Sequence, residues 1–156
     1  MKLTRLALEN WRNIPHALIE PEDGLNVLCG ENGQGKTNLL EAVWMLTGAK
    51  SFRAAKDAEM IRRGADFAVL DGAAECGGRV QTIYLTVGGP GTQRPGRTAR
   101  LNGVDKGRAA SLAGTFTAVV FEPDHLGLIK GSPGGRRRFL DAALCQLYPG
   151  YLAALR

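Results

Sequence analysis

The sequence lacks any long apolar run, and no stretch approaches the roughly eighteen apolar residues that a membrane-spanning helix requires. It also lacks a secretory signal, because its first residues alternate polar and apolar side chains and offer no small-residue cleavage site. The composition, with 44% hydrophobic and 22% charged residues, is typical of a globular protein. We therefore expect a soluble cytoplasmic protein without a membrane partner.

Cysteine is scarce, and its spacing excludes two further classes of protein. The three cysteines, Cys29, Cys76 and Cys145, lie far apart, are odd in number and match no metal-ligand pattern. This excludes a disulfide framework and a zinc site, so the sequence predicts buried, reduced thiols.

Positive charge is in excess, since the formal net charge is +5 and 14 of the 20 cationic residues are arginine. An excess of this size permits a polyanionic partner such as nucleic acid, but net charge alone does not identify one.

The first third of the chain has the pattern of an α/β protein. Residues 2–9 and 16–20 read as a strand hairpin, and the apolar residues 25–29 favour a central parallel strand that is covered on both faces. Apolar residues at helical spacing predict a helix over residues 37–47, which Gly48 terminates.

The middle third has the pattern of an antiparallel meander. Residues 67–76 and 79–87 read as strands joined by Gly77 and Gly78, and Asn102-Gly103 is a strong hairpin signal. A short helix is expected over residues 57–62.

The last part of the chain changes character. Residues 116–123 predict one more strand, after which Ser132 and Pro133 begin a helix that runs to Pro149. A further helix starts at residue 151. We therefore predict two domains, an α/β lobe over residues 1–124 and the beginning of a helical domain over residues 125–156.

The most informative motif lies between the predicted strand 25–29 and the helix that follows it. Its spacing is that of a Walker A loop, in which glycines let backbone N–H groups surround a phosphate and the helix N-terminus adds its dipole. A lysine then counters the β- and γ-phosphate charge, and a threonine hydroxyl can bind Mg²⁺. The predicted nucleotide-binding residues are Gly30, Glu31, Asn32, Gly33, Gln34, Gly35, Lys36 and Thr37, with Thr37 also as the Mg²⁺ ligand.

Several patterns that would narrow the class of nucleotide-binding protein are missing. The loop does not follow the G-x-G-x-x-G spacing of a dinucleotide fold or a protein kinase, and no Asn-Lys-x-Asp appears for guanine. No second apolar strand ends in Asp-Glu, so we expect no catalytic residue within these 156 residues.

Four stretches together resemble the RecF recombination and repair ATPases of the ABC superfamily. They are NWRN at residues 10–13, GENGQGKTNLLEAV at 30–43, SFR at 51–53 and FEPDHLGLIKGSPGGRRRFLD at 121–141. The resemblance implies a P-loop fold, namely the first lobe of an ABC-type ATPase head with a mixed or antiparallel sheet, followed by the start of a helical domain.

The resemblance also implies a function. A protein of this family binds ATP, forms an ATP-dependent homodimer, recognises single-stranded and gapped double-stranded DNA, and helps RecO and RecR load recombinase. It hydrolyses ATP slowly with motifs that lie outside this sequence, so we expect these 156 residues alone to hydrolyse almost none. Two alternatives are a small-molecule kinase with the same loop and a nucleotide-dependent clamp without useful hydrolysis.

Arginines supply the remaining candidate site residues. By the resemblance, Arg12 is either a contact to nucleotide phosphates or a surface arginine in a hairpin loop. Arg136, Arg137 and Arg138 either bind DNA phosphates or a second subunit, or form a solvated helix face in which Arg137 pairs with Asp141. Arg97, in the basic stretch 91–100, is a further DNA candidate, with an ordinary exposed loop as the alternative.

Overall fold

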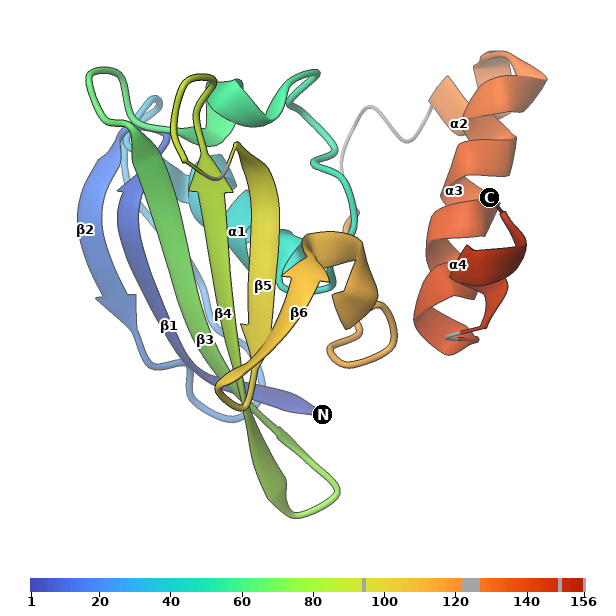
Figure 1. Ribbon diagram of the computed structural model, residues 1–156, viewed down its shortest axis with the longest axis horizontal. Coiled ribbons are helices and arrows are strands. Elements are labelled where there is room, and N and C mark those ends of the chain that lie inside the picture. Colours follow the sequence, from blue (N-terminus) through green and yellow to red (C-terminus); the bar gives the residue numbers. More distant parts are fainter. Residues whose placement is uncertain (94, 122–126, 149, 156) are drawn as a thin grey trace.

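A six-stranded antiparallel sheet forms the body of the molecule (Figure 1). The computed structural model describes residues 1–93, 95–121, 127–148 and 150–155. The strand order is β2-β1-β3-β4-β5-β6, and each neighbouring pair is antiparallel. The strands are β1 (Lys2–Trp11), β2 (Ile14–Ile19), β3 (Phe67–Cys76), β4 (Arg79–Gly88), β5 (Gly96–Leu101) and β6 (Val104–Arg108).

Local turn chemistry explains the meander from β3 to β6. Gly77 and Gly78 join β3 to β4 with φ angles of 57° and 73°, a left-handed conformation that glycine adopts without strain. Asn102 and Gly103, with φ angles of 50° and 78°, form the two-residue turn between β5 and β6. The predicted meander is therefore confirmed, as is the hairpin of β1 and β2.

Helix α1 (Lys36–Met45) covers one face of the sheet (Figure 1). Its buried residues Ala42 and Met45 join a core that includes Leu6, Leu70 and Leu85 from the central strands. After the helix, Gly48 has a φ of 79° beside the backbone of Ala109, so a side chain there would meet both strain and a steric clash. The predicted helix and its glycine stop are confirmed.

The predicted central parallel strand over residues 25–29 is wrong. These residues form no strand and lie exposed, with Leu25 at 89% and Val27 at 69% of full exposure. A parallel strand buried on both faces needs a strand beside it and cover above and below. The described part of the chain supplies neither next to these residues.

The predicted strand over residues 116–123 is also wrong for its described part. Phe116 is buried, but residues 117–121 form no strand, and Val119 is 94% exposed. Residues 122 and 123 lie outside the described residues, as do the neighbours of the proposed boundary at residue 124, which stays a prediction.

The C-terminal helices lie together on one side of the sheet (Figure 1). They are α2 (Gly127–Lys130), α3 (Pro133–Leu147) and α4 (Tyr151–Ala154). Pro133 begins α3 as predicted, because its missing N–H and fixed φ suit the first turn of a helix. A hydrogen bond from Ala118 N to Gln146 Oε1 at 2.8 Å links α3 to the segment after the sheet.

Two short 3₁₀ helices lie outside the sheet. The first, η1 (Asp57–Met60), corresponds to the predicted helix over residues 57–62 and buries Met60. The second, η2 (Ala109–Leu112), follows β6 directly and buries Leu112. Both helices therefore add apolar side chains to the core that α1 shares with the sheet.

Both outer strands of the sheet carry features that discourage further strand pairing. Strand β2 contains Pro15, which has no N–H to donate. Strand β6 is exposed at all five positions, and its pairing with β5 shifts register between Ala99 and Arg100.

The cysteines are free thiols, as predicted, but their predicted burial is wrong. Cys29 lies exposed in the segment 25–29, whereas Cys76 and Cys145 are half-buried. None of the helices in the described ranges has the length and apolar character needed to cross a membrane.

Candidate phosphate-binding site

Residues 30–37 form a tight loop that leads into α1. Its glycines adopt positive φ angles, of 153° at Gly30, 84° at Gly33 and 103° at Gly35. A Cβ atom at Gly30 would lie 2.5 Å from Gln34 Oε1, so a side chain there would also displace the Gln34 amide from its bond to the Glu31 N–H. The predicted glycine positions are therefore required by backbone conformation.

The side chain of Lys36 folds back across this loop. Its Nζ donates to the carbonyl oxygens of Gly30 at 2.6 Å and of Glu31 at 2.7 Å, and Gln34 Oε1 accepts from the Glu31 N–H at 3.1 Å. The ammonium group of Lys36 therefore lies against the loop, where it can interact with an anion bound by the loop.

The start of α1 offers backbone donors to the same place. Gly35 precedes the helix and contributes no side-chain cap. Within the described residues, the N–H groups of Lys36, Thr37 and Asn38 donate to no other protein group. A helix N-terminus with free N–H groups attracts anions, and a ten-residue helix adds a dipole of the same sign.

Thr37 is exposed at this helix start, and within the described residues its hydroxyl has no hydrogen-bond partner. A hydroxyl oxygen is a suitable hard ligand for Mg²⁺. The described residues contain no cluster of three acidic, histidine or cysteine side chains that could hold a metal ion. The residues present therefore fit Mg²⁺ that arrives with a phosphate ligand and takes its remaining oxygens from phosphate and water.

Arg12 lies at the tip of the β1–β2 hairpin, and its side chain packs against α1 and η1. Its Nε and Nη2 donate to the two carboxylate oxygens of Glu41 at 2.9 and 2.7 Å, and its Nη1 donates to Glu59 O at 2.7 Å. The Glu41 side chain is fully buried and also accepts a hydrogen bond from Ser51 Oγ. Arg12 is therefore partly buried and not an ordinary surface arginine, and its contact to nucleotide phosphates stays a prediction.

Asn13 and Asn38 are site residues that sequence reasoning missed. Asn13 Nδ2 donates to Gly33 O at 2.9 Å, and Asn38 Nδ2 donates to Asn13 Oδ1 at 2.7 Å. The signal that could have found them is the NWRN stretch itself, whose last residue is polar and sits at a hairpin tip. Trp11, in the same stretch, is buried and donates its indole N–H to Asn38 O at 2.7 Å.

Arg97 does not lie in an exposed loop but in β5. Its Nη1 donates to Ala49 O at 2.5 Å, and its Nε lies 3.2 Å from Asp57 Oδ1. It therefore connects the segment after α1 to η1, and because its side chain is only 13% exposed it offers little surface to DNA.

The three arginines of α3 are exposed but not equivalent. Arg136 Nη1 donates to the carbonyl oxygens of Leu128 and Gly131, each at 3.1 Å, which ties α3 to α2. Arg137 and Arg138 form no ion pair within the described residues, and the carboxylate of Asp141 accepts from Tyr151 Oη instead, at 2.9 Å. This hydrogen bond raises the pKa of Tyr151.

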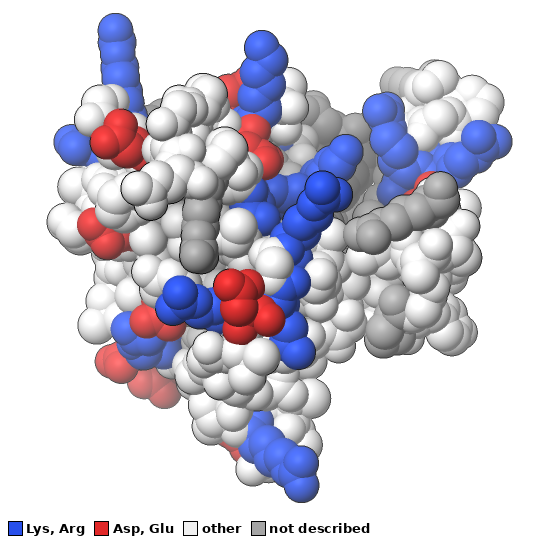
Figure 2. All heavy atoms as spheres, in the orientation of Figure 1, with Lys and Arg blue, Asp and Glu red and all other residues white. Residues whose placement is uncertain are grey.

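Lys and Arg side chains also stand out over the C-terminal helices in the space-filling view (Figure 2). Of the three arginines of α3, Arg137 and Arg138 are the exposed ones for which the described residues provide no hydrogen bond or ion pair.

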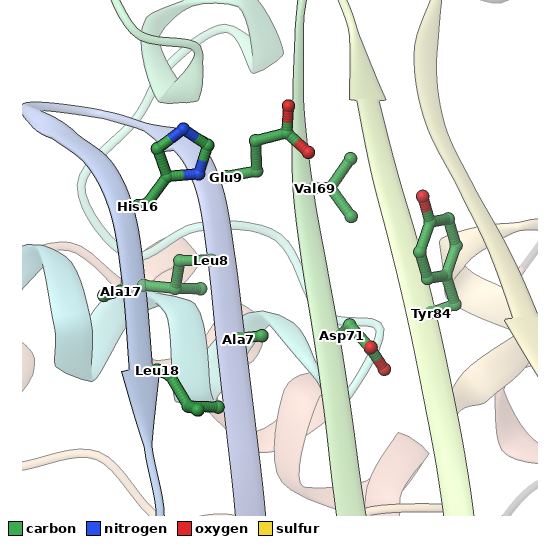
Figure 3. Close-up of a pocket in the computed structure, with 9 residues that line it drawn as sticks. All are labelled: Ala7, Leu8, Glu9, His16, Ala17, Leu18, Val69, Asp71 and Tyr84. Atoms are coloured by element: carbon green, nitrogen blue, oxygen red, sulfur yellow. The ribbon is translucent and has the colours of Figure 1, made fainter.

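The opposite face of the sheet holds a shallow groove of about 550 Å³. Glu9, His16, Asp71 and Tyr84 project into it from four neighbouring strands (Figure 3). None of the loop residues 30–37 lines this groove, and its mixture of acidic, aromatic and aliphatic side chains does not suit a phosphate. The candidate phosphate-binding loop and the groove are therefore separate features.

Comparison with known proteins identifies the relatives of this chain. A family model described as an AAA domain matches residues 5–84, about half of the chain. The RecF DNA replication and repair protein of Geobacillus thermodenitrificans is 39% identical over 152 residues, which cover 97% of this chain and 40% of that protein. RecF of Bacillus mycoides is 39% identical over 155 residues, which cover 99% of this chain and 40% of that protein. The chain thus spans about 40% of the length of the curated relatives it matches.

Solved structures agree with this result. A structure of the recombination mediator protein RecF with ATP, in the RecFOR pathway, superposes with a TM-score of 0.88 at 28% identity, covering 98% of this chain and 41% of that one. The SMC head domain from Thermotoga maritima matches with a TM-score of 0.59 at 23% identity, and the match covers 75% of this chain and 43% of that one. At this level of identity the match supports the fold alone. The predicted resemblance to RecF and the predicted class of ATPase fold are confirmed.

Proposed function

Since the chain belongs to the AAA domain family, we propose that it forms the ATP-binding part of a RecF-type protein of DNA replication and repair. The observation that carries the proposal is the loop 30–37, where three glycines with positive φ, the Lys36 ammonium and the free N–H groups of α1 meet. This combination suits the triphosphate of a nucleotide. ATP is the nucleotide favoured by the similarity to RecF in its ATP-bound form.

Each loop residue has a separate role in this proposal. The N–H groups of the loop and of the first turn of α1 bind the phosphates, and Lys36 counters their negative charge. The Thr37 hydroxyl holds Mg²⁺, which neutralises phosphate charge when it is bound. These residues bind and orient the nucleotide, but no described side chain beside the loop is proposed as a catalytic base.

The proposal for the complete protein follows the RecF relatives. We propose an ATP-dependent homodimer in the cytoplasm that binds single-stranded and gapped double-stranded DNA, cooperates with RecO- and RecR-type mediators and helps load recombinase. Its ATPase is weak and DNA-dependent, and the present 156 residues alone hydrolyse almost no ATP. Similarity to a RecF of the RecFOR pathway supports this proposal.

Arg137 and Arg138 are the proposed DNA contacts of this chain, because both are exposed and within the described residues neither forms an ion pair. Each phosphate contact changes the slope of log affinity against log salt by about 0.9. Changing both to alanine is therefore expected to reduce the slope by about 1.8 in a DNA-binding titration of the complete protein. An unchanged slope would remove both residues from the interface.

Binding of ATP to a Lys36→Ala variant of the complete protein tests the nucleotide site. A charged hydrogen bond contributes about 1.5–3 kcal/mol, so we expect Kd for ATP to rise about 10- to 150-fold. Lys106→Ala is the matched control, because Lys106 is exposed on β6 and away from the loop. If Kd changes less than twofold in both variants, the loop is not the nucleotide site.

ATP turnover of the complete protein, measured with and without gapped DNA, tests the rest of the proposal. Turnover that rises with DNA is the expected result. Turnover that depends on a small-molecule acceptor would favour a kinase, and tight ATP binding without turnover would favour a nucleotide-dependent clamp.

A further inference from the structure

The tip of the β1–β2 hairpin reaches the phosphate-binding loop through one side chain. Asn13 donates from Nδ2 to Gly33 O at 2.9 Å and accepts at Oδ1 from Asn38 Nδ2 at 2.7 Å. It therefore joins the middle of the loop to the first turn of α1. No other described side chain outside residues 30–37 donates a hydrogen bond to a carbonyl of the loop.

The hairpin tip that carries Asn13 is held firmly. Arg12 has a φ of 54°, a conformation that is unfavourable for an ordinary residue and persists only when its surroundings impose it. Here the two bonds to Glu41, the bond to Glu59 O and a backbone bond from Arg12 N to Met60 O at 2.9 Å impose it. Asn13 thus stands on a rigid support.

The partner of Asn13 on α1 is held as well. Arg53 Nη1 donates to Asn38 Oδ1 at 2.7 Å, so the Asn38 amide presents its Nδ2 toward Asn13. Packing adds to this, because a Cβ atom at Gly35 would lie 2.9 Å from Asn13 Oδ1. Glycine at position 35 therefore makes room for the asparagine as well as for the turn.

We propose that Asn13 is a positioning residue for the phosphate-binding loop. A trans peptide is planar, and its C=O and the following N–H point in opposite directions. By holding the Gly33 carbonyl, Asn13 therefore aims the Gln34 N–H away from the hairpin tip, where it can donate to a phosphate. This inference rests on the proposed function, since it assumes that the loop binds phosphates.

The expected effect is moderate because Asn13 is exposed and water can replace its hydrogen bonds. A typical hydrogen bond contributes about 0.5–1.5 kcal/mol net, which corresponds to a loss of affinity of about 2- to 12-fold. We expect the Asn13→Ala variant of the complete protein to bind ATP about 3- to 10-fold more weakly, and inorganic tripolyphosphate more weakly by the same factor.

A second variant and a control separate positioning from general destabilisation. Asn13→Asp keeps the acceptor for Asn38 but loses the donor to Gly33 O and adds a negative charge, so it should weaken ATP binding more than Asn13→Ala does. Asn26→Ala is the matched control, because Asn26 is an exposed asparagine whose hydrogen bonds run to Glu22 and Gly24, outside the loop. We expect it to leave both affinities within twofold of the parent.

Calorimetric titration of the variants with ATP and with tripolyphosphate decides the matter. An equal loss for both ligands in Asn13→Ala, with a smaller loss when Asn38→Ala is already present, supports the positioning role. Unchanged affinities in Asn13→Ala overturn it. If Lys36→Ala weakens ATP binding and Asn13→Ala does not, only the positioning role fails, whereas an unchanged Kd in Lys36→Ala rejects the proposed function itself.

Discussion

The ion pair of Arg12 and Glu41 provides the sharpest test of the packing behind the loop. Arg12→Met keeps much of the side-chain volume but leaves the carboxylate of Glu41 fully buried, with Ser51 Oγ as its remaining described partner. Removing one partner of a buried pair costs about 3–5 kcal/mol, because a buried charge is left uncompensated. Since Arg12 is itself 17% exposed, we expect the lower end, about 3 kcal/mol.

A loss of this size is measurable by thermal unfolding. For a domain of this length each kcal/mol lowers Tm by about 2–4 °C, so the Arg12→Met variant should unfold about 6–12 °C below the parent. Differential scanning fluorimetry of the complete protein without nucleotide measures the shift.

The chain offers a matched control in Arg5, which pairs with Asp71 at 3.0 Å, where both side chains are more than a third exposed. An exposed pair stabilises by at most about 1 kcal/mol, so Arg5→Met should lower Tm by no more than about 4 °C. Adding Glu41→Leu to Arg12→Met should recover part of the loss, because it removes the buried charge. Equal shifts for Arg12→Met and Arg5→Met would refute the reasoning.

Further expectations concern the loop glycines and the cysteines. Gly35→Ala should weaken ATP binding more than Gly33→Ala. Both positions need a positive φ, but only at Gly35 would a Cβ atom approach another residue, at Asn13 Oδ1. Titration of the two variants with ATP measures the difference in Kd. Cys145 should be alkylated by iodoacetamide more slowly than the exposed Cys29, since burial and the charge of Asp141 raise the pKa of Cys145 and lower its thiolate fraction at a given pH. Raising the pH should narrow the difference between the two alkylation rates. Mass spectrometry of the labelled peptides measures these rates, and faster labelling of Cys145 than of Cys29 would contradict the prediction.

Local patterns were sufficient to predict the elements that depend on near neighbours. The β3–β4 and β5–β6 hairpins follow from Gly77-Gly78 and Asn102-Gly103, which adopt the left-handed conformations that tight turns need. Helix α3 begins at Pro133 for an equally local reason. In these cases the residues that specify the structure lie within a few positions of it.

The two strands that were predicted wrongly depend on distant partners. Residues 25–29 and 117–121 have the apolar character of buried strands, but a strand becomes buried only when other segments pair with it and cover it. Apolar character alone therefore indicates only that a segment is suited to burial. The strand forms only when other segments pair with it and pack on its faces.

The sequence predicted the loop of the candidate site, but not the hairpin-tip residues that contact the loop and α1. The spacing of Gly30, Gly35 and Lys36 predicted a tight loop before a helix with a lysine folded across it, which the structure shows, and phosphate binding there is our proposal. The roles of Arg12 and Asn13 were not predictable, since their partners on α1 lie 29 and 25 positions away in the sequence. Only the fold brings the hairpin tip against the helix.

The protection of the sheet edges has a consequence for self-association. Pro15 in β2 and the charged, register-shifted β6 make strand-by-strand polymerisation through either edge unfavourable. The apolar side chains of Leu25 and Val27 have no such protection. At high concentration, copies of this chain should therefore aggregate through residues 25–29, and a charged substitution such as Val27→Lys should delay the onset of turbidity more than any change in β2 or β6.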